Sequence, residues 1–170
     1  MNLIVAVDEN WGIGYKGDLL LKISEDLKYF KRITTGHVVV MGRVTFESLP
    51  GQKPLKNRSN VVLTRYDSSH LLLGGGKGEV NDIIICHTVE EVLDFCRDKE
   101  TFIIGGEQIY KLFIPYCKKA YITKIHSTFK ADKHLPKFVE SSDWRLAEKS
   151  EVFYTEEGNG YQFLVYERGD

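Results

Sequence analysis

Asp26 is the residue whose position in the sequence first points to chemistry. Residues 24–34 have the spacing of an amphipathic helix, and at about 100° per residue Asp26 falls on the apolar side with Ile33. Burying a carboxylate on such a face is costly unless something pairs with it. The pattern predicts a carboxylate at the floor of a pocket, flanked by Leu27 and Phe30. Its two oxygens would accept a pair of N–H donors from a cationic or amidine-like ring.

Asp26 also has a purely structural explanation. Acidic residues are common in the first turn of a helix, where the helix N-terminus stabilises them. A carboxylate in this position can also cap a neighbouring strand. The sequence pattern leaves the structural and the functional interpretations open.

Two glycine-bearing turns each lead from a buried strand into a helix, at 41–43 and at 104–107. Glycine at such a turn lets backbone N–H groups approach a phosphate, although a tight turn needs glycine in any case. Two such turns on parallel strands predict a diphosphate ligand across the strand ends. Thr64 and Arg65 follow another strand, and with Arg43 they form a predicted clamp for an extra phosphate, such as the 2′-phosphate of NADPH.

The elements that must position these residues alternate between strand and helix. Short apolar runs rich in β-branched residues predict buried strands at 3–7, 38–41, 61–64, 83–86 and 102–104. Helices are expected between them, from a Ser24 cap to about Thr34, and over 43–49, 88–97 and 107–113. This alternation predicts an α/β fold, with one three-layer domain over 1–170, a mainly parallel central sheet of about eight strands and about four flanking helices.

The C-terminal part of the chain has a different pattern. The runs 121–125, 152–156 and 161–167 have no helices between them, and Asn159-Gly160 is typical of a hairpin turn. We therefore expect an antiparallel hairpin at one edge of the sheet. The glycine-rich stretch 74–78 lacks the spacing of a phosphate-binding loop and is interpreted as a flexible loop tip.

Composition and charge narrow the classes of function. The 170 residues are 42% hydrophobic and 28% charged with a net charge of −1, which argues against a disordered tail and a basic nucleic-acid binder. Residues 16–65 hold ten Lys or Arg against four Asp or Glu, a local charge of +6. This excess indicates either an anionic small ligand or a solvated helix face.

The cysteines and the first residues indicate the compartment. Cys86, Cys96 and Cys117 are odd in number and have no zinc-ligand spacing, so we expect no metal site. Cys86 and Cys96 follow apolar residues, so we expect both to be buried thiols. The chain begins with a short apolar run that reaches Asp8 without a basic segment, so we expect neither a signal peptide nor a membrane span. These features predict a soluble cytoplasmic protein.

Seven segments together resemble bacterial dihydrofolate reductases, in the family's order and over nearly the whole chain. Among them Met41-Gly42-Arg43-Val44-Thr45-Phe46-Glu47-Ser48 and Ile103-Ile104-Gly105-Gly106-Glu107-Gln108-Ile109-Tyr110 are the most specific in combination. The others are Ile4–Val7, Gly12–Gly14, Asp26–Lys31, Arg58–Leu63 and Tyr121–Thr123.

The resemblance implies reduction of 7,8-dihydrofolate by NADPH, with hydride added to C6 and a proton to N5 of the pterin. It implies that Asp26 is the catalytic carboxylate that binds the pterin, with Thr123 hydrogen-bonded to it, and that Arg58 pairs with the α-carboxylate of the glutamate tail. The other substrate-binding residues that it implies are Ile4, Ala6, Leu27, Phe30, Leu49, Leu55, Ile104 and Tyr110. The same site would bind antifolates.

The resemblance also implies a cofactor site for NADPH, with contacts to the nicotinamide, the diphosphate and the adenine-ribose phosphate. The residues that it implies are Ala6, Ile13, Gly14, Gly42, Arg43, Val44, Thr45, Leu63, Thr64, Arg65, Ile104, Gly105, Gly106, Glu107, Gln108 and Ile109. It further predicts a cis peptide bond between Gly105 and Gly106, and a monomer.

The sequence departs from the family pattern in two places. The family's Leu-Pro-Trp before the first helix is Leu19-Leu20-Leu21 here, so a leucine replaces the tryptophan that orders a water near the pterin. The Pro-Gly that precedes the family's arginine is Lys56-Asn57. We expect a more open and less polar pocket at Leu21.

Two other functions fit part of the pattern. A reductase of the same fold that acts on a ribosylated aminopyrimidine in riboflavin synthesis would keep the glycine turns without needing Asp26 and Arg58 together. A non-catalytic NADPH- or pterin-binding module would keep the turns and lose turnover. Neither alternative predicts an interaction with nucleic acid or a membrane.

Overall fold

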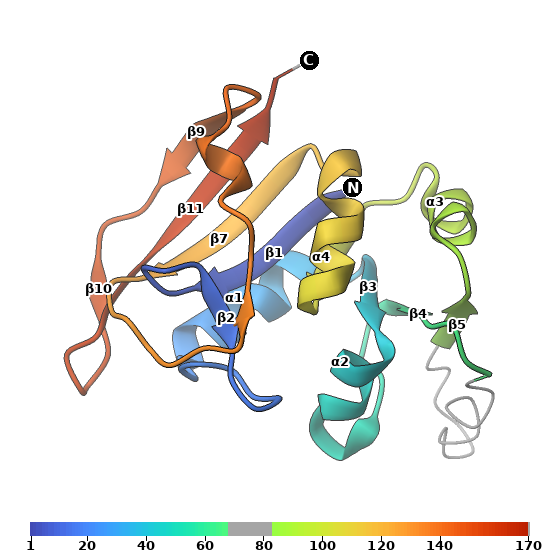
Figure 1. Ribbon diagram of the computed structural model, residues 1–170, viewed down its shortest axis with the longest axis horizontal. Coiled ribbons are helices and arrows are strands. Elements are labelled where there is room, and N and C mark those ends of the chain that lie inside the picture. The colour runs from blue at the N-terminus through green and yellow to red at the C-terminus, as the bar shows by residue number, and fades with distance from the viewer. Residues whose placement is uncertain (68–82, 170) are drawn as a thin grey trace.

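A mixed β-sheet forms the centre of the molecule (Figure 1). The computed structural model describes residues 1–67 and 83–169. Within them the sheet has nine strands in the order β10-β11-β7-β1-β6-β3-β4-β5, with β9 also paired to β11. The parallel strands are β1 (Asn2–Val7), β3 (Val38–Gly42), β4 (Ser59–Leu63), β5 (Ile83–Cys86), β6 (Thr101–Gly105) and β7 (Lys119–Ile125). The antiparallel strands are β9 (Trp144–Lys149), β10 (Phe153–Tyr154) and β11 (Gly160–Arg168).

Helices cover both faces of this sheet, as the α/β pattern predicts. They are α1 (Ser24–Thr34), α2 (Arg43–Ser48), α3 (Val89–Cys96) and α4 (Glu107–Phe113). Val92 of α3 and Phe113 of α4 belong to the same buried cluster as Leu3. Phe46 of α2 packs on the opposite face in a cluster with Met41, and α1 lies over β7 and β11 on that second face. The predicted three-layer architecture is confirmed.

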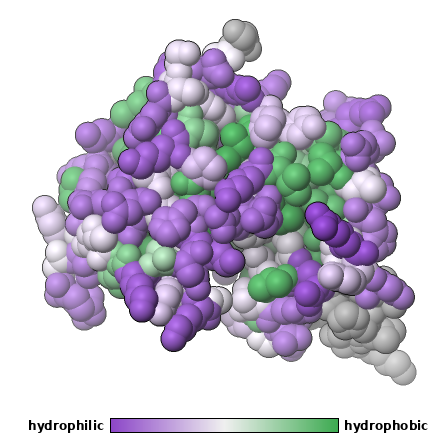
Figure 2. All heavy atoms as spheres, viewed as in Figure 1, coloured by the Kyte–Doolittle hydropathy of each residue, from purple (hydrophilic) through white to green (hydrophobic). Residues whose placement is uncertain are grey.

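The surface of the α4 side is mostly polar. Figure 2 shows hydrophilic side chains over most of this face, with hydrophobic side chains gathered beside α4 on the side toward α3. No helix in the described residues is long and apolar enough to cross a membrane.

Two neighbouring parallel strands in the middle of the sheet, β1 and β6, separate toward their carboxyl ends. Strands β1 and β6 pair only at Asn2 with Phe102 and Leu3 with Ile103, whereas β1 remains paired with β7 through Val7. The gap opens at the carboxyl ends of the strands, where ligands bind in open α/β sheets.

Of the three local predictions about helix caps and the hairpin turn, one is confirmed and two are wrong. Thr88 caps α3 as predicted, because its hydroxyl accepts a hydrogen bond from Glu91 N at 3.1 Å. Ser24 does not cap α1: the cap position is Ile23, which is buried with Ile125 and Tyr161, so an apolar contact fixes the start of this helix.

The C-terminal hairpin is present, but its turn is not Asn159-Gly160. Gly160 is already in β11 and pairs with Tyr154. The turn is closed by Thr155 N donating to Asn159 O at 2.9 Å, and Gly158 supplies the left-handed backbone at φ 88°.

The remaining differences concern short or polar strands. The sequence did not predict β9, nor the small second sheet of β2 (Gly12–Gly14) and β8 (Lys133–His134). Cys86 and Cys96 are buried and free, as predicted, and Cys117 is buried and free as well. The glycine-rich stretch 74–78 lies outside the described residues.

Candidate active site

Asp26 faces the sheet from the first turn of α1. Its Oδ1 accepts a hydrogen bond from the Thr123 hydroxyl at 2.5 Å, and Thr123 is paired with Ala6 on the adjacent strand. Burial raises the pKa of the Asp26 carboxyl, and the Thr123 hydrogen bond offsets part of that rise. Among the described residues no cation pairs with Asp26. Its second oxygen can therefore accept from a ligand, which is the arrangement expected for a paired N–H donor.

A buried tyrosine lies in the gap between β1 and β6. The Tyr110 hydroxyl donates to the Ile4 carbonyl at 2.8 Å, and the Tyr110 pKa is raised by burial and by the Asp26 charge. A carbonyl oxygen has two lone pairs. Ile4 O can thus accept a second hydrogen bond from a ligand in the gap.

Several of the predicted substrate-binding residues are apolar side chains packed beneath α2. Leu49, Leu55 and Ile104 are partly buried against the cluster of Val39, Met41, Phe46 and Val62. Phe30 is partly buried on α1. Leu27, which the helix pattern places beside the carboxylate, is 48% exposed and so is not part of the apolar core.

Arg58 is held by neutral groups. Its Nε donates to Lys56 O at 2.9 Å and its Nη1 to Thr34 Oγ1 at 3.1 Å, and its guanidinium lies 6.0 Å from the Phe30 ring centre. Burial lowers the Arg58 pKa. Two of its five N–H donors are used, so the others are available for an anion.

The two glycine turns lie side by side, because Met41 of β3 pairs with Gly105 of β6. The bond between Gly105 and Gly106 is cis, as predicted. A Cβ on Gly42 would approach Ile109 to 3.1 Å, and Gly105 has φ 122° with Tyr110 packed over it. Close approach requires glycine at the first turn, and the backbone conformation requires it at the second.

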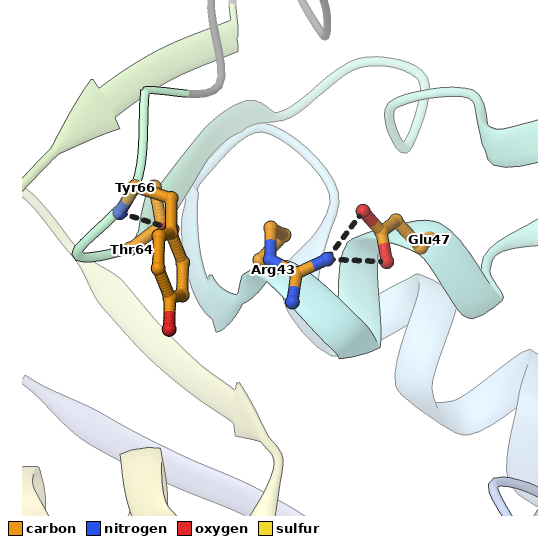
Figure 3. Close-up of polar contacts among 4 residues, drawn as sticks. All are labelled: Arg43, Glu47, Thr64 and Tyr66. Carbon is orange, nitrogen blue, oxygen red and sulfur yellow. Dashed lines mark hydrogen bonds and ion pairs between the residues drawn. The ribbon is translucent and has the colours of Figure 1, made fainter.

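Arg43 directly follows the first of these turns and forms an ion pair with Glu47 on the same helix. Its Nη1 donates to both carboxylate oxygens of Glu47, at 2.8 and 3.0 Å. Figure 3 shows the Arg43 guanidinium between Glu47 and the Tyr66 ring, whose centre is 5.8 Å away. The Thr64 hydroxyl accepts from Tyr66 N at 3.2 Å and so fixes the turn after β4.

The other predicted cofactor residues differ in their contacts and their burial. Thr45 lies next to the second turn, since its hydroxyl would be 3.5 Å from a Cβ on Gly106. Glu107 is paired with Lys111 at 2.9 Å, which lowers its pKa. Of the predicted cofactor residues not yet described, Ala6, Ile13 and Leu63 are partly buried, Gly14 and Ile109 are buried, and Val44, Arg65 and Gln108 are exposed.

Sequence reasoning missed three buried polar residues near the site. Asn60 and Thr34 hold the segment that contains Arg58. Asp8 accepts from Gly12 N at 2.8 Å and Phe129 N at 3.0 Å. For Asn60 and Asp8 the available signal was a polar residue inside or directly after an apolar strand, whereas Thr34 ends helix α1 and had no such signal.

Comparisons with known proteins agree with this geometry. The family model described as dihydrofolate reductase matches residues 1–168. The dihydrofolate reductase of Bacillus subtilis (strain 168) is 40% identical over 171 residues, which covers 99% of this chain and 94% of that protein. The dihydrofolate reductase of Staphylococcus haemolyticus is 35% identical over 170 residues and covers 99% and 95%.

A solved structure shows the same fold. Dihydrofolate reductase from Enterococcus faecalis, complexed with NADP(H) and RAB-propyl, aligns with a TM-score of 0.82 at 32% identity, over 99% of this chain and 96% of the other. The sheet, the paired glycine turns and the half-buried carboxylate all conform to one family, and the chain belongs to the dihydrofolate reductases.

Proposed function

We propose that the protein reduces 7,8-dihydrofolate to 5,6,7,8-tetrahydrofolate with NADPH, and thereby supplies one-carbon metabolism. The observation that supports this most directly is the Asp26 carboxylate. It has a neutral hydroxyl partner and a free oxygen, and it shares the sheet edge with the two glycine turns.

Asp26 would bind the pterin through the 2-amino group and the neighbouring ring nitrogen. Thr123 holds one carboxylate oxygen, so the carboxylate presents a fixed edge to the ring. The carbonyls of Ile4 and Ile104 would accept from the 4-amino group of an antifolate. Apolar contact with the pterin and aminobenzoyl rings would come from Ala6, Leu27, Phe30, Leu49 and Leu55.

The residues present also fit NADPH. Gly42 and the Gly105-Gly106 pair leave room for backbone N–H groups to approach the diphosphate, with Thr45 beside them. Arg43, Thr64 and Arg65 would contact the 2′-phosphate. Leu63 would lie at the adenine end and Ile13, Gly14 and Tyr110 at the nicotinamide end. The remaining contacts would come from Val44, Glu107, Gln108 and Ile109.

When bound, NADPH supplies the hydride that adds to C6 of dihydrofolate. Asp26 orients and polarises the pterin, and the proton for N5 arrives through water, so the carboxyl need not be the direct donor. The raised pKa of Asp26 keeps part of the carboxyl protonated at higher pH than an exposed aspartate.

Leu21 distinguishes this pocket from the family pattern. It is partly buried against Ile23, Ile125 and Tyr161, where it offers no N–H to a water near the pterin. We therefore expect Leu21→Trp to change the kinetics of dihydrofolate reduction and the affinity for antifolates. Unchanged values in both measurements would contradict this assignment.

Steady-state assays of NADPH oxidation test the function. We expect turnover with dihydrofolate and none with a ribosylated aminopyrimidine. No turnover with dihydrofolate at any pH, together with NADPH binding in a fluorescence titration, would instead identify a binding module.

The state of the protein in the cell is part of the proposal. The protein would act as a cytoplasmic monomer that binds dihydrofolate and antifolates, without nucleic-acid or membrane partners. Sedimentation velocity with and without NADPH measures the oligomeric state, and we expect a monomer in both conditions.

A further inference from the structure

Asn60 is a fully buried amide near the start of β4. Its Oδ1 accepts from Leu55 N at 2.9 Å, and its Nδ2 donates to Leu55 O at 2.9 Å and to Arg58 O at 3.0 Å. One side chain thus joins both ends of the segment 55–58. That segment contains the apolar Leu55 and the cationic Arg58.

The orientation of the Arg58 guanidinium depends on the shape of this segment. Arg58 Nε donates to Lys56 O, which lies within the segment itself. Its Nη1 reaches outward to Thr34 on α1, and the Thr34 hydroxyl in turn donates to Phe30 O at 2.8 Å. A change in the backbone at Lys56 would move one of these two anchors relative to the other.

The segment lacks the usual means of fixing its own conformation. It contains no proline, and Asn57 has a positive φ of 58°, which costs a non-glycine residue energy. Its outer side is held by Gly36 N, which donates to Asn57 O at 2.7 Å. The three hydrogen bonds of Asn60 hold the inner side.

We propose that Asn60 is a positioning residue for recognition of the glutamate tail of the substrate, acting through Arg58. This assignment rests on the proposed function, since it presupposes that Arg58 binds a carboxylate. Asn60 itself touches no ligand: it fixes the segment so that the free N–H donors of Arg58 face the α-carboxylate.

The test distinguishes recognition of the glutamate tail from recognition of the pterin ring. Asn60→Ala and Asn60→Asp are compared with wild type on dihydrofolate and on a dihydropterin without the aminobenzoylglutamate tail. Asn60→Asp keeps an acceptor for Leu55 N and loses the amide donors to Leu55 O and Arg58 O, so it changes two of the three hydrogen bonds, whereas Asn60→Ala removes all three. Asn2→Ala is the matched control, because Asn2 is another buried strand asparagine, bonded to Glu100 away from the site.

We expect both Asn60 variants to raise KM for dihydrofolate by about 10- to 100-fold, the scale of a misplaced binding group. Their kcat, their affinity for NADPH and their KM for the dihydropterin should stay within about twofold of wild type. In an Arg58→Ala background, adding Asn60→Ala should raise the dihydrofolate KM no further, because the two residues act as a unit.

Three results would overturn the assignment: an equal rise in KM for both substrates, an unchanged KM for dihydrofolate, or effects of Asn60→Ala and Arg58→Ala that simply add. Failure of the proposed function looks different, because wild type would then not turn over dihydrofolate at all.

Discussion

The two halves of the candidate site handle charge differently. On the substrate side, Asp26 is bonded to the hydroxyl of Thr123, and Arg58 is bonded to Thr34 and a backbone carbonyl. On the cofactor side, Arg43 is paired with Glu47, and Glu107 is paired with Lys111. Among the described residues the substrate side therefore keeps two charges with neutral partners, whereas on the cofactor side Arg43 and Glu107 each have an oppositely charged partner and Arg65 is exposed.

This difference matches the ligands that we propose. The pterin offers N–H donors to a carboxylate and the glutamate tail offers a carboxylate to an arginine, so each substrate-side charge meets its partner only in the complex. A charge held by neutral dipoles is ready for such a partner, but it makes the unliganded fold less stable. The phosphates of NADPH would be met largely by backbone N–H groups, so the cofactor side needs less uncompensated charge.

Removing the substrate-side carboxylate should have the largest effect. We expect Asp26→Asn to lower kcat for dihydrofolate about 100-fold or more near neutral pH, the scale of lost acid–base assistance. The deficit should narrow as the pH falls, because more of the substrate is already protonated at N5. The pH profile of kcat measures both effects.

The control for this variant is Glu25→Gln, which changes an exposed acid on the same helix. Its kcat should match wild type throughout the pH range. An Asp26→Asn enzyme that kept most of its activity would show that the carboxylate does not bind the reacting ring.

Removing the substrate-side cation should have the next largest effect. Arg58→Leu is expected to raise KM for dihydrofolate by about 10- to 100-fold, because a charge-assisted contact to the tail is lost. KM for a dihydropterin without the tail should not change. Arg32→Leu, an exposed arginine of α1 that lies over the Tyr29 ring, is the control, and an equal effect there would point to general electrostatic steering instead.

On the cofactor side, removing a charged residue should strengthen ligand binding rather than weaken it, and by a smaller factor. Glu47→Gln leaves Arg43 without its compensating charge, so we expect NADPH to bind about two- to fivefold more tightly at low salt, the scale of one half-exposed ion pair. The gain should shrink as salt rises. Fluorescence titrations at several salt concentrations measure it, with Glu90→Gln on α3 as the control. Weaker binding at low salt would mean that Glu47 mainly orients Arg43.

Sequence and structure agree where the pattern is strong and local. Continuous apolar runs such as 38–41 and 83–86 identify buried parallel strands, because such strands are covered on both faces. Strand β9 was missed because half of its six residues are charged and interrupt any continuous apolar run, and all but Trp144 are exposed. The α1 cap was assigned to Ser24 because the sequence does not show that Ile23 packs against Ile125 and Tyr161.

In the candidate site, too, some features can be predicted from the sequence pattern and others depend on the folded structure. The helix pattern of α1 already places Asp26 among apolar residues. Its partner Thr123 lies 97 residues further along the chain and was expected only from the family resemblance, and the structure shows that hydrogen bond. The hydrogen bond from Arg58 to Thr34 joins two elements 24 residues apart, so it depends on how they fold together. The bonds of Asn60 to Leu55 are local, but they depend on the exact turn of the segment between them. The Arg43–Glu47 pair is different, because its i, i+4 spacing is visible in the sequence.

The smallest expected effect concerns stability. Burial raises the pKa of Asp26 in the folded state, so the ionised carboxylate costs the fold energy above that pKa, and the cost disappears below the unfolded value of 3.8. Asp26→Asn keeps an oxygen that can accept from Thr123, and it removes the charge. We therefore expect its Tm to exceed that of wild type by a few degrees at alkaline pH and to converge with it as the medium becomes acidic. Thermal unfolding across pH measures this difference, and a variant less stable than wild type at alkaline pH would show that the charge of Asp26 is compensated in the folded protein.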